Sequence, residues 1–184
     1  MAKATSKKLA AALRDKTLVR FTRPFEDGWV EGYVLDLGPK WFLLAFLDNN
    51  IRFNGFQCFR LSDVREPQVP APYAAFVEAA LKKRGAHRPK KPRVSVASIE
   101  ELLLSANRSF PLVTIHREKV DPDVCAVGRV LEVRDERLSL LEISPDASWE
   151  VEATQYRLRD ITRVDFGGDY EDALYLVGGR PATK

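Results

Sequence analysis

The first half of the chain alternates apolar, strand-like segments with short turns, after one helix. Residues Ser6–Leu13 are rich in alanine and leucine, and Ser6 stands where a helix cap is expected. From Thr17 onward, β-branched and aromatic residues dominate and are interrupted by segments with turn chemistry. This pattern predicts four strands and a short fifth one: Thr17–Arg23, Trp29–Leu37, Lys40–Leu47, Ile51–Leu61 and Asp63–Arg65.

Gly55 lies inside the longest of these strands, where a glycine indicates a bulge or a sharp bend. A helix followed by about five short, bent antiparallel strands is typical of a small Sm-like or SH3-like β-barrel, in which closure removes exposed edges. A second helix is expected over Pro72–Leu81. Its apolar residues recur on one face: Tyr73, Phe76, Val77 and Leu81.

The second half of the chain repeats this order of elements. Ser98 can cap a helix, and Glu101 follows three residues later in the capping-box position. The apolar face of that helix consists of Ile99, Leu102, Leu103 and Ala106. Strands are expected at Leu112–His116, Val124–Val133, Arg137–Ile143, Trp149–Leu158 and Ile161–Phe166, and Leu174, Leu176 and Val177 match the position of the second helix of the first half.

A six-residue motif occurs twice. Phe59-Arg60-Leu61-Ser62-Asp63-Val64 is repeated 97 positions later as Tyr156-Arg157-Leu158-Arg159-Asp160-Ile161. Other pairs of segments align at offsets that differ by one to three residues, which indicates a duplicated unit. We therefore predict two internally duplicated barrels, over residues 1–84 and 97–184, joined by a linker over residues 85–96.

Composition is that of a soluble globular protein, with 45% hydrophobic and 30% charged residues among 184. The longest apolar run, Trp41–Leu47, is far shorter than the roughly 20 residues that cross a bilayer. The N-terminal residues lack the apolar core of a signal peptide. Cys58 and Cys125 lie in strand-like stretches, so we expect two buried thiols and a cytoplasmic protein.

The net charge of +3 conceals an asymmetry between the halves. Residues 1–96 contain 18 basic and 9 acidic side chains, whereas residues 97–184 contain 11 and 17. Most of the positive excess lies in one tract without acids: Lys82, Lys83, Arg84, Arg88, Lys90, Lys91 and Arg93. These cations could neutralise phosphates of RNA or single-stranded DNA. Alternatively, the tract is a solubilising linker that docks on the acidic second barrel.

Eight aromatic residues of the first half form a second candidate site for nucleic acid. They are Trp29, Tyr33, Trp41, Phe42, Phe46, Phe53, Phe56 and Phe59. Arg52 and Arg60 are interspersed with these rings along one strand, and bases stack on exposed rings for about 1–3 kcal/mol each. The alternative is that the rings fill the core of a small barrel.

Catalytic chemistry has little support in the sequence. His87 and His116 are the only histidines, and neither has a cysteine, an acid or a second histidine at metal-ligand or triad spacing. The acidic segment Asp165–Asp172 is best interpreted as a Gly-Gly turn that leads into a helix N-terminus, where acids are favourable. We therefore expect a non-catalytic protein without a cofactor or a metal ion.

One known family is similar to the central part of the first half. Trp41-Phe42-Leu43 resembles the Trp-Tyr-Leu signature of WYL domains, and Phe59–Val64 resembles a later stretch of that family. Phe42 replaces the family's tyrosine, and Ser62-Asp63-Val64 lacks the arginine that precedes the final aliphatic residue. The resemblance implies an Sm-like barrel. Single units of that fold associate through strand edges, which implies that the two barrels pack as an intramolecular pseudo-dimer.

Two functions remain open at this level. In the first, the protein binds RNA or single-stranded DNA through the basic tract, with Arg52, Arg60 and Trp41 contributing from the first barrel. In the second, the barrels form a scaffold that binds a protein partner, and the tract only tethers them.

Overall fold

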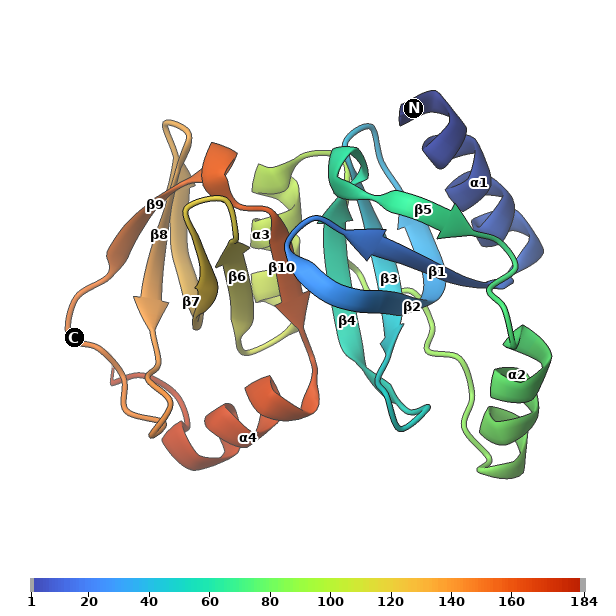
Figure 1. Ribbon diagram of the computed structural model, residues 1–184. Coiled ribbons are helices and arrows are strands. Elements are labelled where there is room, and N and C mark those ends of the chain that lie inside the picture. The colour runs from blue at the N-terminus through green and yellow to red at the C-terminus, as the bar shows by residue number, and fades with distance from the viewer. Residues whose placement is uncertain (1, 183–184) are drawn as a thin grey trace.

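The chain forms one large antiparallel sheet with four short helices around it (Figure 1). The computed structural model describes residues 2–182. Ten strands follow one another in the order β5-β1-β2-β3-β4-β10-β6-β7-β8-β9, and the sheet is open, with β5 and β9 at its edges. The expectation of a mainly β protein is confirmed.

The elements of the first half lie close to where the sequence predicts them. They are α1 (Ala2–Asp15), β1 (Leu18–Arg23), β2 (Glu26–Leu37), β3 (Trp41–Leu47), β4 (Phe53–Arg60), the 3₁₀ turn η1 (Leu61–Asp63), β5 (Arg65–Gln68) and α2 (Ala74–Lys83). The proposed cap at Ser6 is wrong, since α1 already begins at Ala2 and Ser6 lies inside it. Alanine and lysine before Ser6 are good helix formers, so the helix extends through them.

The second half contains α3 (Ile99–Ser109), β6 (Val113–Arg117), β7 (Asp121–Arg134), β8 (Arg137–Glu142), β9 (Thr154–Arg157), the 3₁₀ turn η2 (Leu158–Asp160), β10 (Arg163–Phe166) and α4 (Asp169–Gly178). Ser98 caps α3 as expected, accepting a hydrogen bond of 3.2 Å from the Glu101 amide. The strand expected at Trp149–Leu158 is shorter. Trp149 forms only an isolated bridge with Ile143, and regular pairing begins at Thr154.

Strand connectivity repeats between the halves. The first half is ordered β5-β1-β2-β3-β4 and the second β10-β6-β7-β8-β9, so β10 occupies the place that β5 has in the first half. The repeated motif also recurs in equivalent places, because η1 follows β4 and η2 follows β9. β10 pairs with β4 as well as with β6, and thereby makes the two halves one sheet.

The largest hydrophobic cluster belongs to both halves. Trp41, Leu43 and Cys58 of the first half pack in the same cluster as Leu102 of α3 and Val164 of β10. A second cluster lies between α1 and the inner face of β1–β4, where Phe21, Phe42 and Phe59 meet edge to face or tilted. Helix α3 therefore covers the junction of the halves, and α1 covers the first half alone.

Burial differs from the apolar pattern of the sequence in three places. Tyr73 and Phe76 of α2 are 77% and 63% exposed, because only the stripe of Val77 and Leu81 contacts the sheet. In α4, Leu174 is buried, but Leu176 and Val177 point to solvent. Of the two thiols Cys58 is buried, whereas Cys125 is exposed. The two helices are short and bury one narrow stripe each, whereas Cys125 lies in the exposed first part of β7.

The bulge expected at Gly55 is present. Ala45 pairs with Phe56 and Leu47 with Phe53, so β4 holds one extra residue opposite β3. Gly55 has φ = +71°, and a Cβ placed there would lie 2.5 Å from the backbone nitrogen of Gly168. Within residues 2–182, no helix is both long enough and apolar enough to cross a membrane.

Replacement of Gly55 by alanine should destabilise the fold by about 2–4 kcal/mol, since it combines a strained φ with a backbone collision against the β10–α4 turn. Gly85→Ala is the matched control, because Gly85 has φ = +67° but its added Cβ would meet open space. That control should cost only about 1 kcal/mol. Urea denaturation of the three proteins measures the difference, and equal losses would disprove the close approach.

Candidate functional site

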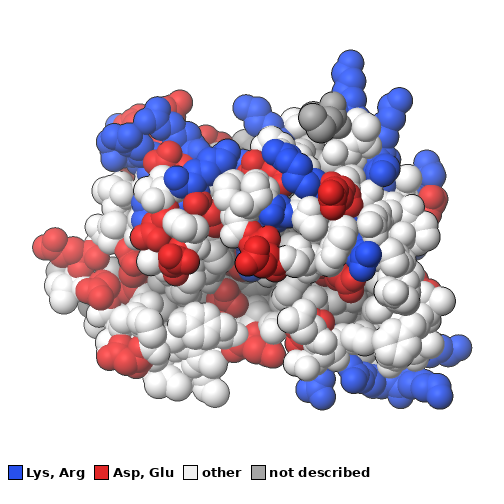
Figure 2. Space-filling model, in the orientation of Figure 1, with Lys and Arg blue, Asp and Glu red and all other residues white. Residues whose placement is uncertain are grey.

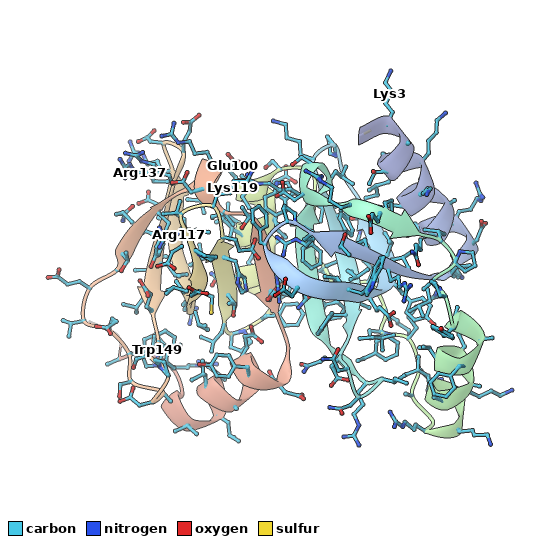
Figure 3. The ribbon with its side chains drawn as sticks, viewed as in Figure 1. Lys3, Glu100, Arg117, Lys119, Arg137 and Trp149 are labelled. Atoms are coloured by element: carbon cyan, nitrogen blue, oxygen red, sulfur yellow. The ribbon has the colours of Figure 1, made fainter. Side chains whose placement is uncertain are left out.

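A large hollow in the surface of the described residues lies where the two copies of the motif meet. It is a cleft of about 1000 Å³. Its walls come from α1, the β2–β3 turn, η1, the start of α3, the β7–β8 turn and η2, and its lining residues are Lys3, Ser6, Pro39, Lys40, Trp41, Arg60, Leu61, Ser62, Ile99, Glu100, Glu136, Leu158 and Arg159. In the view of Figure 3, Lys3 and Glu100 both lie along the upper edge of the molecule.

Arg60 holds the two halves together at the base of this cleft. Its Nη2 donates a hydrogen bond of 2.5 Å to the carbonyl oxygen of Arg159, and its guanidinium lies 5.6 Å from the centre of the Trp41 ring. Burial lowers the pKa of Arg60, and nearby carboxylates, Asp63 first among them, partly oppose that shift. The side chain is half-buried, so part of its charge faces the cleft.

Positive charge exceeds negative charge in the cleft. Four cations line it, Lys3, Lys40, Arg60 and Arg159, against the two carboxylates Glu100 and Glu136. Figure 2 shows basic side chains along the upper edge of the molecule, with a second group at its lower right, and acidic ones mainly on the left. An anion would therefore be attracted to the upper edge.

The basic tract lies elsewhere and is partly held in place. Arg84 Nη1 donates to the carbonyl oxygens of Asn50 and Ile51 at 2.5 and 2.9 Å. Lys91 forms an ion pair of 2.5 Å with Asp36. Arg88 Nη1 donates to the Lys16 carbonyl at 3.2 Å, and its guanidinium lies over the ring of Tyr33. These three side chains therefore contact the first half rather than the acidic second half.

The candidate residues chosen from the sequence lie in three parts of the structure. Arg60 and Trp41 line the cleft, whereas Lys82, Lys83 and Arg84 lie at the end of α2, beside Arg52. Arg52 and Arg60 lie at opposite ends of β4, which separates them by about 26 Å for eight residues of strand. Lys90 and Arg93 are exposed in the segment between α2 and α3. The structure therefore does not bring the ten residues into one site.

Most of the aromatic side chains belong to the core. Tyr33, Trp41, Phe42 and Phe59 are each 5% exposed or less, and Phe46, Phe53 and Phe56 are partly buried. Trp41 contributes the floor of the cleft and presents little ring face to a base. Among the eight, only Trp29 is classed as exposed, and the Arg20 guanidinium lies 4.2 Å from its centre.

Sequence reasoning missed three of the four cleft cations. Lys3 and Lys40 belong to no motif, and only folding brings them beside Arg60. Arg159 was part of the repeated motif, at the position of Ser62 in the first copy. The repeated motif was therefore the one sequence signal for a cleft cation, Arg159, because it placed two arginine-bearing turns at equivalent points of the halves.

A buried ion-pair network lies close to the cleft. The side chain of Arg23 is fully buried and donates to Glu118 through Nη1 at 2.9 Å and Nη2 at 2.6 Å. Glu26 is its second carboxylate partner. The hydroxyl of Thr162 also donates to Glu118, at 2.5 Å. Burial raises the pKa of Glu118, but the hydrogen bonds from Arg23 and Thr162 outweigh it and lower the pKa.

Asp165 is the centre of a second part of this network. Arg163 Nη2 lies 2.7 Å from its Oδ2, and His116 Nε2 lies 3.0 Å from the same oxygen. Burial raises the pKa of Asp165, but Arg163 and His116 together hold it at about 2. The expectation that His116 has no acid nearby is therefore wrong, because the acid lies 49 positions away in the chain.

Cys125, His116 and Asp165 are the residue types of a thiol-enzyme triad and are neighbours in the sheet. Cys125 is the strand partner of His116, and His116 contacts Asp165. Burial, with Asp165 next, raises the pKa of the Cys125 thiol. A nucleophilic cysteine requires a lowered pKa. The arrangement therefore favours a structural ion pair rather than an activated thiol.

No family model matches the chain, and neither a curated protein nor a solved structure matches it.

Stability should fall in acid through Asp165. Its pKa is lower in the folded protein than the ordinary 3.8, so it stabilises the fold above about pH 4 and loses that contribution as the pH falls towards 2. The loss should be about 2 kcal/mol. Urea denaturation between pH 6 and pH 2 measures it.

Asp165→Asn should flatten this pH dependence, although it also lowers stability at neutral pH by leaving Arg163 without its closest partner. Asp123→Asn, at an exposed position of β7, is the control and should leave the profile unchanged. Parallel profiles for wild type and Asp165→Asn would contradict the assignment.

Proposed function

We propose that the protein is a non-catalytic binding protein for single-stranded nucleic acid, RNA or single-stranded DNA, and that the cleft between η1 and η2 is its binding site. The observation that supports this most directly is the convergence of Lys3, Lys40, Arg60 and Arg159 on one hollow. We further propose that it acts in the cytoplasm, where its two free cysteines stay reduced.

The chemistry of the cleft suits a phosphate backbone. Lysine and arginine neutralise phosphates and release their counterions, which gives affinity without sequence preference. Arg60 is held by its bond to Arg159 and by Trp41, so it loses little side-chain freedom on binding. The volume of about 1000 Å³ lies at the upper end of the usual range for ligand pockets, about 300–1000 Å³.

We interpret the fold as two Sm-like or SH3-like units that arose by internal duplication and pack as an intramolecular pseudo-dimer. The repeated strand order and the equivalent positions of η1 and η2 support this interpretation. In it, the cleft is the place where the same turn of each unit meets its counterpart.

The basic tract is the alternative location of the nucleic-acid site, and it competes with the cleft rather than adding to it. Lys82, Lys83, Lys90 and Arg93 are exposed, and none has an ion pair within the described residues. Lys82 and Lys83 lie at the end of α2, beside Arg52 and away from Arg60, so a strand bound in the cleft would not contact them.

Protein binding is the alternative function, and exposed apolar side chains favour it. Tyr73 and Phe76 protrude from α2, and Leu176 and Val177 from α4, each more than 60% exposed. Recovery of a stoichiometric protein partner that resists nuclease treatment would favour a scaffold over a nucleic-acid-binding protein.

Removal of two exposed cleft cations, by Lys40→Gln with Arg159→Gln, should weaken binding to a labelled single-stranded oligonucleotide by about 25-fold at 0.1 M salt. The slope of log affinity against log salt should fall by about 1.4, since each lost phosphate contact removes about 0.7. Fluorescence anisotropy over a series of salt concentrations measures both quantities.

The control is Lys82→Gln with Lys83→Gln, which removes the same charge at the end of α2. It should bind within about twofold of wild type, a spread equal to roughly 0.4 kcal/mol. Absence of wild-type binding at low salt would rule out the proposed function. Loss of binding in the control alone would move the interface to the basic tract.

A further inference from the structure

Three arginines form a row across the strands at the far edge of the sheet. Arg134 of β7 is the direct partner of Arg137 of β8, and Arg137 is the direct partner of Arg157 of β9. Directly opposed residues in antiparallel strands project to the same face, with Cβ atoms about 4.5–5.5 Å apart. All three side chains are exposed. They therefore form one row, which lies on the opposite face from the buried Leu138 and Tyr156.

This row is unfavourable for the isolated protein. Like charges directly opposite each other in a sheet destabilise it. Arg134 has an exposed contact of 3.3 Å with its neighbour Asp135, but Arg137 and Arg157 have no ion pair within residues 2–182. The next rung on the same face is made of Glu132, Ser139 and Gln155, and supplies a single carboxylate. Three cations with one exposed ion pair and one further carboxylate on the same face leave an excess of positive charge, which favours an anionic partner.

The row adjoins the cleft. The amide of Leu158 donates to the Glu136 carbonyl at 2.9 Å, which holds η2 against the β7–β8 turn. Glu136 and Arg159 line the cleft, and Arg137 and Arg157 are close to them in the chain. Figure 3 shows Arg137 at the upper left of the molecule, where Figure 2 shows a group of basic side chains.

We propose that Arg134, Arg137 and Arg157 bind the phosphodiester backbone of the nucleic acid where it leaves the cleft. This inference rests on the proposed function and extends it, since it assigns the outer face of β7–β9 to the same strand. Arginine suits this task because its planar guanidinium donates two parallel hydrogen bonds to a phosphate. A strand that reaches both places must be longer than one that fills the cleft alone.

The test is the triple variant Arg134→Ser, Arg137→Ser and Arg157→Ser in the full chain. Its matched control is Arg52→Ser, Lys82→Ser and Lys83→Ser, which removes the same charge from exposed positions near α2. Anisotropy is measured with single-stranded oligonucleotides of about 5 and about 20 nucleotides, which bracket typical site sizes.

The triple variant should lose on the order of tenfold to hundredfold in affinity for the long oligonucleotide at 0.1 M salt. The slope of its log affinity against log salt concentration should become shallower by about 2. Its affinity for the short one should stay within about threefold of wild type, or roughly 0.7 kcal/mol. Its melting temperature should rise by about 1–3 °C, because the repulsion within the row is gone. The control should keep wild-type affinity for both.

Several outcomes would overturn the proposal. Unchanged affinity of the triple variant for the long oligonucleotide would show that the row does not bind it. The proposal that the cleft binds nucleic acid would then still stand. An equal loss of affinity for both oligonucleotides would refute the idea that the row binds the strand where it leaves the cleft. No binding of either oligonucleotide by wild type would refute the proposed function itself. Tighter binding of polyglutamate than of the long oligonucleotide would identify the partner as an acidic protein.

Discussion

Pairing between β4 and β10 is the interaction on which the rest of the structure depends. It inserts the last strand of the chain between the two halves and makes one sheet of ten strands. As a result α3 packs on residues of both halves, and the main hydrophobic cluster is shared. The same pairing places η1 beside η2, so that Arg60 can reach the carbonyl of Arg159. Without it there is no cleft.

Buried charges act together with this pairing. Arg23 and Glu118 are 95 positions apart and belong to different halves, yet both are almost fully buried and bonded through two contacts. Burying such a pair costs about as much as its attraction returns, so its contribution to net stability is small. Separating the two charges is strongly unfavourable, however. The network therefore adds little to the stability of the native arrangement of the two halves. Its main effect is to disfavour other arrangements, in which these charges would be separated.

Local sequence patterns predicted the helices and strands. Long-range contacts determine which of their side chains are buried and which groups they contact. The cap at Ser98 and the bulge at Gly55 follow from residues close in sequence, and both are found. Helical periodicity alone put Tyr73 and Phe76 on a buried face, because it could not show how little of α2 meets the sheet. His116 gained an acid from another strand. The basic tract was conspicuous in sequence, whereas the cleft cations were scattered and became a group only on folding.

Arginine appears in this protein in two opposite electrostatic situations. Arg23 and Arg163 are surrounded by carboxylates from several elements, and each lies over the ring of Phe59. Their charges are satisfied within the fold and are not available to a ligand. Arg137 and Arg157 have the same chemistry but face solvent opposite each other, where repulsion lowers stability. A functional site can reduce stability when a ligand restores the lost energy on binding. For this reason our proposal places the anion at the uncompensated arginines rather than at the longest basic run in the sequence.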